Sequence, residues 1–338
     1  MSASSGIAIE LRERYHDVVG DRWPVAVAPQ ADELLSSWLH RLALANGVAP
    51  RAFGDIVSGA GGMWSARLDL RLPQALAAWL SARTGLASDE ISVLAMSDNA
   101  MAPLWLPQRE TAHRRRSTWL QFCALCLADD RVPYFRRCWR LASRVSCFRH
   151  GCGLRDRCPA CRGGLAPFAQ ADLAPQHIGA RCGFDLRAAA RISVAATARR
   201  LERSINDFSV VQIAKRSSAI HAWVAQLTRI PQLAGVESGR SLVEHSASAR
   251  IHCFERLAQS ADKDAASARI RRRRPTRTAG GRDGLMSRFV DFADERQRSP
   301  RVAPGLGVDL SGLLAAYSQA IRRSSRAKPD GADRNRAA

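Results

Sequence analysis

Cysteine and histidine residues between positions 123 and 182 have the spacing of zinc ligands. The first two pairs are Cys123 with Cys126 and, further along the chain, Cys147 with His150. Two ligands separated by two residues lie on one tight turn, and two such pairs complete a tetrahedral zinc site. A neutral imidazole suits zinc as the last of the four ligands. The sequence therefore predicts a structural zinc ion bound by these four residues.

A second, less complete ligand group follows. Its thiols belong to Cys158, Cys161 and Cys182. A ligand pair that ended at residue 182 would need a cysteine at position 179, where the chain has Gly179. We expect His177 to take the place of this fourth ligand. Cys152 is an alternative ligand, and an incomplete, metal-free group is the remaining alternative.

Enzymatic alternatives rest on the same cysteines. A CxxC pair is also the motif of a redox-active dithiol, although a dithiol needs no third and fourth ligand. A cross-brace ubiquitin-type ligase is a further alternative. Asp129 and Asp130 are adjacent, whereas nuclease carboxylates converge on a metal from separate elements. The sequence has no P-loop, dinucleotide-binding glycine motif or nucleophile elbow. We therefore expect a protein that is not an enzyme.

The ligand pattern and its surroundings resemble the TniQ family, the target-selection proteins of certain DNA transposons. The central match consists of Cys123-x-x-Cys126, Pro133-Tyr-Phe-Arg-Arg137 with Trp139-Arg-Leu141, Cys147-x-x-His150-Gly151, Leu154, Cys158-Pro-x-Cys161 and Cys182-Gly-Phe-Asp-Leu186. An N-terminal match adds Asp32-Glu-Leu-Leu-Ser-Ser-Trp-Leu-His-Arg-Leu-Ala43 and Asn46-Gly47. Together they cover residues 23–187. Family members usually have a cysteine near Gly179, and Cys138 and Cys152 lie outside the family pattern.

The resemblance implies a role in choosing the DNA target of a transposon. A protein of this family would link target recognition to a transposase and to its AAA+ ATPase, and would catalyse no reaction itself. The alternative is a zinc-containing transcriptional regulator that shares the module without a transposon. Genes for a transposase and an AAA+ ATPase beside this gene would favour the first function over the second.

The chain is strongly basic, with 51 lysine and arginine residues against 31 acidic residues and a net charge of +20. The charge is uneven: residues 1–110 carry 9 basic and 12 acidic side chains, residues 111–162 carry 12 and 3, and residues 261–338 carry 18 and 9. Such an excess favours a polyanionic partner, DNA before a membrane surface. The predicted DNA contacts are Arg114, Arg115, Arg116, Arg136, Arg137, Arg140, Arg144, Arg271, Arg272, Arg273 and Arg274.

The sequence shows no signal for export or membrane insertion. Its first residues lack a basic segment followed by an apolar run, and no window approaches the ~20 apolar residues of a membrane span. Nine cysteines, an odd number arranged around CxxC pairs, suit metal binding in a reducing compartment better than disulfides. We therefore expect a cytoplasmic protein.

Apolar residues recur at helical spacing along the N-terminal third. Residues 32–45 and a segment from Pro73 are helix candidates, and a turn at Gly85 leads into a further helix over residues 89–96. This unit is typical of a helix-turn-helix. Its second helix has two acidic residues and no basic one, which disfavours phosphate. We therefore expect the unit to dock a protein, such as a second copy in a homodimer, with Trp64 as a candidate contact.

We predict a mainly α-helical protein in four parts. The parts are an N-terminal helix-turn-helix-like domain (1–110), a central zinc-ribbon or zinc-knuckle module with short strands (111–187), a C-terminal helical domain (188–258) and a basic, partly disordered tail (259–338). Capping-box patterns at Ser209 and Ser241 predict two helix starts in the C-terminal domain. Residues 261–284, which include four consecutive arginines, are expected to form a disordered linker.

Overall fold

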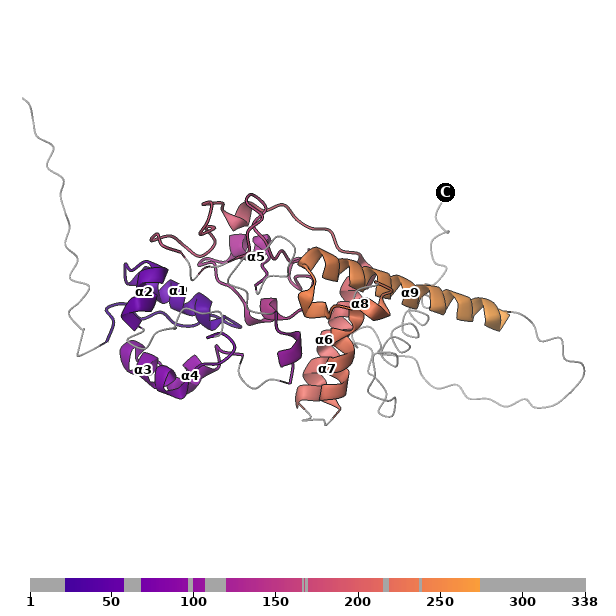
Figure 1. The fold of residues 1–338 in the computed structure, drawn as a ribbon, viewed down its shortest axis with the longest axis horizontal. Coiled ribbons are helices and arrows are strands. Elements are labelled where there is room, and N and C mark those ends of the chain that lie inside the picture. The colour runs from indigo at the N-terminus through magenta and orange to yellow at the C-terminus, as the bar shows by residue number, and fades with distance from the viewer. Residues whose placement is uncertain are drawn as a thin grey trace, which may run out of the picture. The chain divides into compact units, whose positions relative to one another are not determined.

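The computed structural model describes residues 22–57, 68–96, 100–106, 120–165, 167, 170–214, 219–236 and 239–273. The chain divides into two compact units, whose helices are labelled in Figure 1. Unit 1 comprises residues up to Asn99, Leu106–Leu141 and Arg155–Arg191, and unit 2 comprises Ala100–Trp105, Ala142–Leu154 and residues from Ile192 onward. The predicted mainly helical class is confirmed, while the predicted boundaries of the four parts stay predictions. None of the described helices is both long enough and apolar enough to span a membrane.

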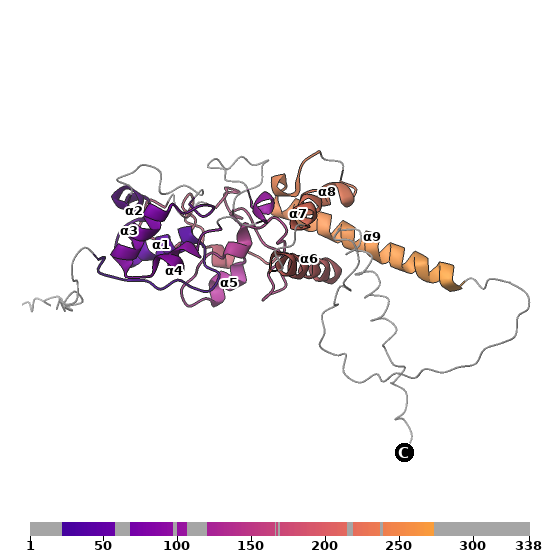
Figure 2. The same cartoon turned by 90° about the horizontal axis from the view of Figure 1, so that it is seen from below.

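Unit 1 begins with four helices, which Figure 2 shows gathered in one group. They are α1 (Leu35–Ala45), α2 (Pro50–Val57), α3 (Gln74–Thr84) and α4 (Ser88–Ser92). On α1, the predicted apolar stripe that includes Trp38, Leu39 and Leu42 is buried. These side chains share one core with Phe53 of α2 and Leu80 of α3. The apolar spacing therefore marks the core face of α1, as amphipathic helices require.

The predicted helix-turn-helix has a shorter second helix than expected. Gly85 follows α3 in a left-handed conformation with φ of 74°. The next helix, predicted over residues 89–96, is confined to Ser88–Ser92. Beyond it, the carbonyl of Leu94 and the N–H of Met96 form hydrogen bonds to other segments of unit 1. These tertiary hydrogen bonds replace the bonds that would continue the helix.

The rest of unit 1 consists of short helices and loops. The helices are α5 (Ala124–Asp129), η2 (Arg137–Arg140) and η4 (Leu186–Ala188). Isolated antiparallel bridges, such as Phe122 with Arg155 and Ile178 with Asp185, hold the loops together. In the described part of the central region, the predicted short strands are thus reduced to single bridges.

The described part of unit 2 is built on four α-helices that pack on one another. Its elements are η1 (Ala102–Leu104), α6 (Ala196–Ala214), α7 (Ile220–Thr228), α8 (Ile230–Leu233), η5 (Leu242–Glu244) and α9 (Ala247–Arg273). Helix α6 packs against α7 and α9, and α8 packs against α9. Trp223 of α7 is fully buried, and its indole N–H donates to the hydroxyl oxygen of Ser209 at 2.9 Å. The helical segments predicted after residue 188 therefore form a packed core.

Of the two predicted helix starts in unit 2, one is wrong and the other begins a shorter helix than expected. Ser209 lies inside α6, where its hydroxyl donates to the carbonyl of Ile205 at 2.8 Å, a bond that a helix interior accommodates. The capping box at Ser241 forms, because its N–H donates to the carboxylate of Glu244 at 2.9 Å, but it begins only η5, and the longer helix α9 begins at Ala247. The two patterns look alike in sequence, but Ser209 is buried within α6.

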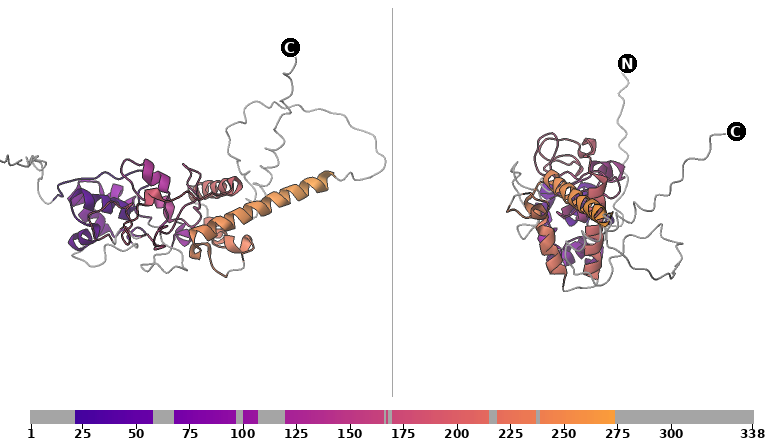
Figure 3. Two further views of the ribbon diagram at one scale, coloured as in Figure 1. Left: turned by 90° about the horizontal axis from the view of Figure 1, so that it is seen from above. Right: turned by 90° about the vertical axis from the view of Figure 1, so that its right-hand side faces the viewer.

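Helix α9 extends further than predicted, and Figure 3 shows it as one long rod. Residues 261–273, expected to be part of a disordered linker, are helical up to Arg273. They are rich in alanine and arginine, which favour helices, and they continue a helix already anchored by the buried Phe254 and Leu257. Of the earlier predictions, those on Trp64, Arg114, Arg115, Arg116 and Arg274 lie outside the described residues.

Candidate metal centres

Cys123 and Cys126 form the first predicted ligand pair, at the start of α5. Cys123 is the last extended residue before the helix, and Cys126 lies in its first turn. The carbonyl of Cys123 accepts from the N–H of Leu127 at 3.1 Å, which closes this turn. Residues three apart lie on one face of a helix, and both thiols are buried. The pair is therefore placed by local structure and shielded from water.

Cys147 and His150 form the second pair, on a tight turn in unit 2. The N–H of Cys147 donates to the carbonyl of Cys152 at 2.8 Å, and the N–H of Gly151 donates to the carbonyl of Cys147 at 2.7 Å. Gly151 has φ of 62°, a conformation that favours glycine. The turn places Sγ of Cys147 3.5 Å from Nδ1 of His150.

These four residues fit a zinc ion. Together they are a group that could hold a metal ion. With Zn–S bonds of about 2.3 Å and Zn–N bonds of about 2.05 Å at tetrahedral angles, a sulfur and a nitrogen ligand lie about 3.6 Å apart. The 3.5 Å between Cys147 and His150 agrees with this value. The two further ligand atoms beside Cys123 and Cys126 favour a metal over a redox dithiol.

The second group consists of three thiols in unit 1. The Sγ atoms of Cys158, Cys161 and Cys182 lie within 4.8 Å of one another, and those of Cys158 and Cys182 are 3.6 Å apart. Two thiolates on one zinc ion lie about 3.8 Å apart, so this geometry also fits zinc. Burial raises the pKa of the Cys158 thiol. For Cys161 burial acts in the same direction, but the N–H of Gly163, the two thiols and Arg181 together lower the pKa.

His177 does not join this group, contrary to the prediction. Among the described residues, the group contains neither the imidazole of His177 nor the thiol of Cys152. The N–H of Leu186 donates to the carbonyl of His177 at 2.9 Å, which closes a hairpin with Cys182 at its turn. His177 thus lies at the base of the hairpin, away from the turn. Its ring is buried, and burial followed by the charge of Arg187 lowers its pKa.

Position 179 is the place where a fourth thiol would fit. The N–H of Gly179 donates to the carbonyl of Phe184 at 2.9 Å across the hairpin. A Cβ atom on residue 179 would lie 3.6 Å from Sγ of Cys182 and 3.4 Å from the Phe184 carbonyl oxygen, which are ordinary contact distances. A cysteine could therefore replace this glycine beside the three thiols without displacing the backbone.

Gly179→Cys should tighten zinc binding by the second group. Four thiolates close a tetrahedral site, whereas three leave one position open, so we expect at least about tenfold slower or weaker zinc transfer to a chelator. The measurement is a zinc-transfer titration with a chelating dye. Gly179→Ser adds a side chain of similar size without a thiol and is the control, and His177→Ala should match wild type. Equal zinc transfer from the cysteine and serine variants would contradict the assignment of position 179.

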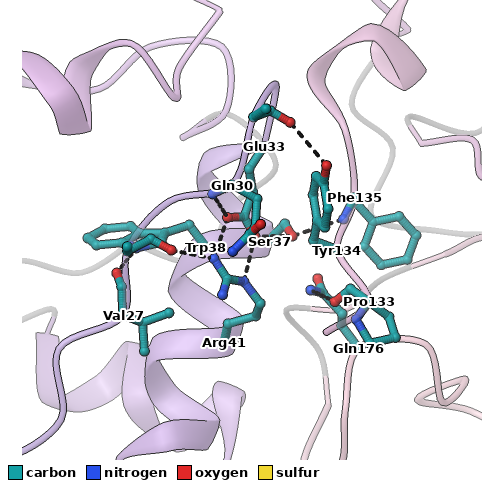
Figure 4. Close-up of polar contacts among 12 residues, drawn as sticks. Val27, Gln30, Glu33, Ser37, Trp38, Arg41, Pro133, Tyr134, Phe135 and Gln176 are labelled. Atoms are coloured by element: carbon teal, nitrogen blue, oxygen red, sulfur yellow. Dashed lines mark hydrogen bonds and ion pairs between the residues drawn. The ribbon is translucent and has the colours of Figure 1, made fainter. Parts of the chain in front are cut away.

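A buried polar network in unit 1 joins α1 to the segment before η2 (Figure 4). Glu33 is fully buried, and its carboxylate accepts from the hydroxyl of Ser37 at 2.9 Å and from Nε and Nη2 of Arg41 at 2.8 and 2.6 Å. The hydroxyl oxygen of Ser37 accepts from the N–H of Phe135 at 2.9 Å, across 98 residues of sequence. The hydroxyl of Tyr134 donates to a backbone carbonyl in the loop before α1. This network joins the N-terminal and central segments that carry the TniQ resemblance.

A comparison with family models places these two segments in one known region. Residues 24–154 match the TniQ family. The resemblance seen in the sequence is thereby confirmed over this range. No curated protein matches the chain.

The TniQ region contains the first candidate metal centre and ends before the second. Its last matched residue, Leu154, precedes Cys158. The assignment of the cysteines after Leu154 as metal ligands therefore rests only on the geometry of their own group.

Within the TniQ region, Arg140 forms a buried ion pair. The side chains of Arg140 and Asp69 both have 0% exposure, and Nη1 lies 3.1 Å from Oδ2. Ser36 donates to the Asp69 carboxylate through its N–H at 2.7 Å and its hydroxyl at 2.9 Å. Burial raises the pKa of Asp69 and lowers that of Arg140, and the opposite charge of each partner counteracts the shift. Arg140 is therefore a structural residue, and we exclude it from the DNA contacts predicted earlier.

Two further predicted DNA contacts in unit 1 are engaged with acidic partners. Arg136 pairs with Asp130 at 2.8 Å, and its guanidinium lies 4.2 Å from the ring centroid of Tyr134. Its side chain is only 14% exposed. Arg137 pairs with Asp32 at 3.3 Å and is 33% exposed, so it is the more accessible of the two.

The remaining described candidates lie in unit 2. Arg144 lies 3.8 Å from the carboxylate of Glu202 and is 12% exposed. Glu202 is fully buried and was not singled out in the sequence, because nothing in the local pattern of α6 distinguishes it from the exposed charges around it. The other candidates, Arg271, Arg272 and Arg273, are the last three residues of α9.

Proposed function

We propose that this chain is a non-catalytic adaptor of DNA transposition, which helps to choose the target DNA and links it to a transposase and to an AAA+ ATPase. The observation that carries the proposal is the TniQ match over residues 24–154. The structure supports it through the contact between the N-terminal and central family segments, made by Ser37 and Phe135. Two separate segments of the matched region thus pack together within unit 1.

We propose that zinc has a structural role in this adaptor. The ligands Cys123, Cys126, Cys147 and His150 form a complete set of four, which leaves no position for a substrate or a water nucleophile. The three-thiol group would hold a second zinc ion more weakly. This arrangement supports a protein that binds and connects rather than one that catalyses.

The charge of the chain supports DNA as a partner. Its net charge of +20 favours phosphate, and the arginines outside the buried Arg140 remain the proposed contacts. A second copy of the chain, docked through the helices of unit 1, is a further proposed partner. Such an adaptor would act in the cytoplasm, where the thiol ligands stay reduced.

Deleting the gene from a cell that carries the complete element tests the proposal. Targeted transposition should be lost, and the full-length chain supplied in trans should restore both its frequency and its target sites. A tagged chain should also co-purify the transposase and the AAA+ ATPase encoded beside it. Unchanged transposition after deletion, with altered expression of neighbouring genes instead, would favour the transcriptional regulator.

A further inference from the structure

A short hairpin in unit 2 is fixed to helix α6 by a buried carboxylate. Ser146 and Gly153 form an antiparallel bridge, and the turn between them carries the Cys147–His150 ligand pair. The carboxylate of Glu202 accepts from the N–H groups of Val145 and Ser146 and from the hydroxyl of Ser146. The position of the turn is therefore set by a residue in the interior of α6.

This attachment brings two arginines of α6 to the turn. Arg199 and Arg203 lie four residues apart, on one face of the helix, with Glu202 between them in sequence. Together with residues 146–151 they line a cavity of about 250 Å³. The turn itself contributes a third guanidinium, that of Arg149.

The cavity is built for a group of negative charge. Three arginines line it, and none of the described lining residues carries a carboxylate. Nε of Arg199 is buried and has no hydrogen-bond partner among the described residues. An anion in the cavity would supply hydrogen-bond acceptors for guanidinium N–H groups.

Gly151 allows the guanidinium of Arg199 to come close to the turn. A Cβ atom on residue 151 would lie 2.3 Å from Nη1 of Arg199, a distance that atoms cannot occupy together. The positive φ of Gly151 also disfavours any other residue. The lack of a side chain on Gly151 thus leaves room for this guanidinium beside the turn.

An exposed aromatic residue lies at the edge of the cavity. Phe148 is 47% exposed, and the guanidinium of Arg144 lies 3.6 Å from its ring centroid, with that of Arg203 at 5.6 Å. Cations over an aromatic ring and a ring open to solvent are the elements from which proteins build contacts to nucleic-acid backbones and bases. An isolated anion would need no such ring.

We infer that this cavity binds a phosphate group of the DNA backbone, held by Arg149, Arg199 and Arg203, with Phe148 against the adjoining nucleotide. The inference rests on the proposed function, because it takes DNA as the source of the phosphate. Sites for whole small molecules occupy about 300–1,000 Å³. A cavity of about 250 Å³ is better matched to one phosphate diester.

Charge-removing substitutions on α6 test the inference in the full-length protein. Arg199→Gln and Arg203→Gln should each weaken binding to a DNA duplex about tenfold, because a hydrogen bond to a charged group is lost. The log–log slope of affinity against salt should fall by about 0.9 for one lost phosphate contact. Arg200→Gln removes the same charge from an exposed neighbour on α6 outside the cavity, and should stay within about twofold of wild type.

The readouts are fluorescence anisotropy at several salt concentrations and a thermal melt by circular dichroism. If Arg199→Gln fails to fold, Arg203→Gln still decides, since Arg203 is exposed. Wild-type DNA affinity in both variants, or an equal loss of affinity in Arg200→Gln, would overturn the assignment of this cavity as a phosphate site. Neither result would exclude DNA binding elsewhere on the protein. Absence of DNA binding by wild type would count against the DNA part of the proposed function itself.

Two further comparisons separate the sources of phosphate. Binding of inorganic phosphate by wild type, with unchanged DNA affinity in the variants, would overturn the assignment to DNA. Tighter, variant-sensitive binding of an RNA duplex of the same sequence would also overturn it. Phe148→Ala should weaken DNA binding without changing the salt slope, because stacking neutralises no phosphate.

Discussion

Cys126→Ser should remove the zinc ion of the first group and unfold the structure around it. Serine cannot supply a thiolate, and a structural site with three ligands loses much of the binding energy that also drives folding. Zinc binding contributes about 10–16 kcal/mol in zinc-finger peptides, so we expect a loss of more than about 3 kcal/mol of unfolding free energy. Elemental analysis of the purified protein and a thermal melt are the measurements.

Cys138→Ser is the matched control. Cys138 is half-buried and lies outside both ligand groups, so the same exchange of sulfur for oxygen should leave the zinc content unchanged. The change in melting temperature should be small by comparison. If the two serine variants kept the same zinc content and melting temperature, the first group would not be a zinc site.

Arg140→Met should destabilise unit 1 by about 3–5 kcal/mol, because it leaves the Asp69 carboxylate buried without its counter-charge. The two hydrogen bonds from Ser36 do not replace a positive charge. A urea or guanidinium denaturation curve at neutral pH measures the loss. DNA affinity should fall only as far as the folded fraction falls, since Arg140 has no exposure.

Two further variants make this result specific to the ion pair. Arg137→Met removes a charge from an exposed pair three residues away and should cost about 0–1 kcal/mol. The double variant Asp69→Leu with Arg140→Met should be more stable than Arg140→Met alone, because no unpaired charge remains. A double variant less stable than the single one would show that packing around the two side chains, rather than charge, causes the loss.

Local patterns predicted the parts of this protein that depend on neighbouring residues. The ligand pairs Cys123–Cys126 and Cys147–His150 could be read from spacing, because each pair is held by a single turn. The core face of α1 could likewise be read from its apolar period. The capping box at Ser241 joins residues three positions apart and also forms as predicted, although it begins only η5.

Long-range contacts decided the features that the sequence analysis missed or misjudged. Arg140 has the positive charge expected of a DNA contact, yet it is buried in an ion pair with Asp69, which lies 71 residues away in sequence. Ser209 has the pattern of a helix start, yet it lies within α6 as the partner of Trp223. No local signal distinguishes such residues, since the partner that changes their role lies elsewhere in the chain.

The sequence alone was sufficient to predict the candidate ligand pairs, the mainly helical class and the TniQ resemblance. These features depend on composition and on spacing within one or two turns. Only the tertiary structure decided which ligands meet and which arginines stay at the surface. His177 was the nearest candidate in sequence for the second group, but the hairpin that carries Cys182 leaves His177 at its base. Likewise, Arg199 became a candidate phosphate ligand only because Glu202 fixes the turn at Gly151 beside it. Such contacts are set by chain packing between distant segments, which spacing along the chain does not encode.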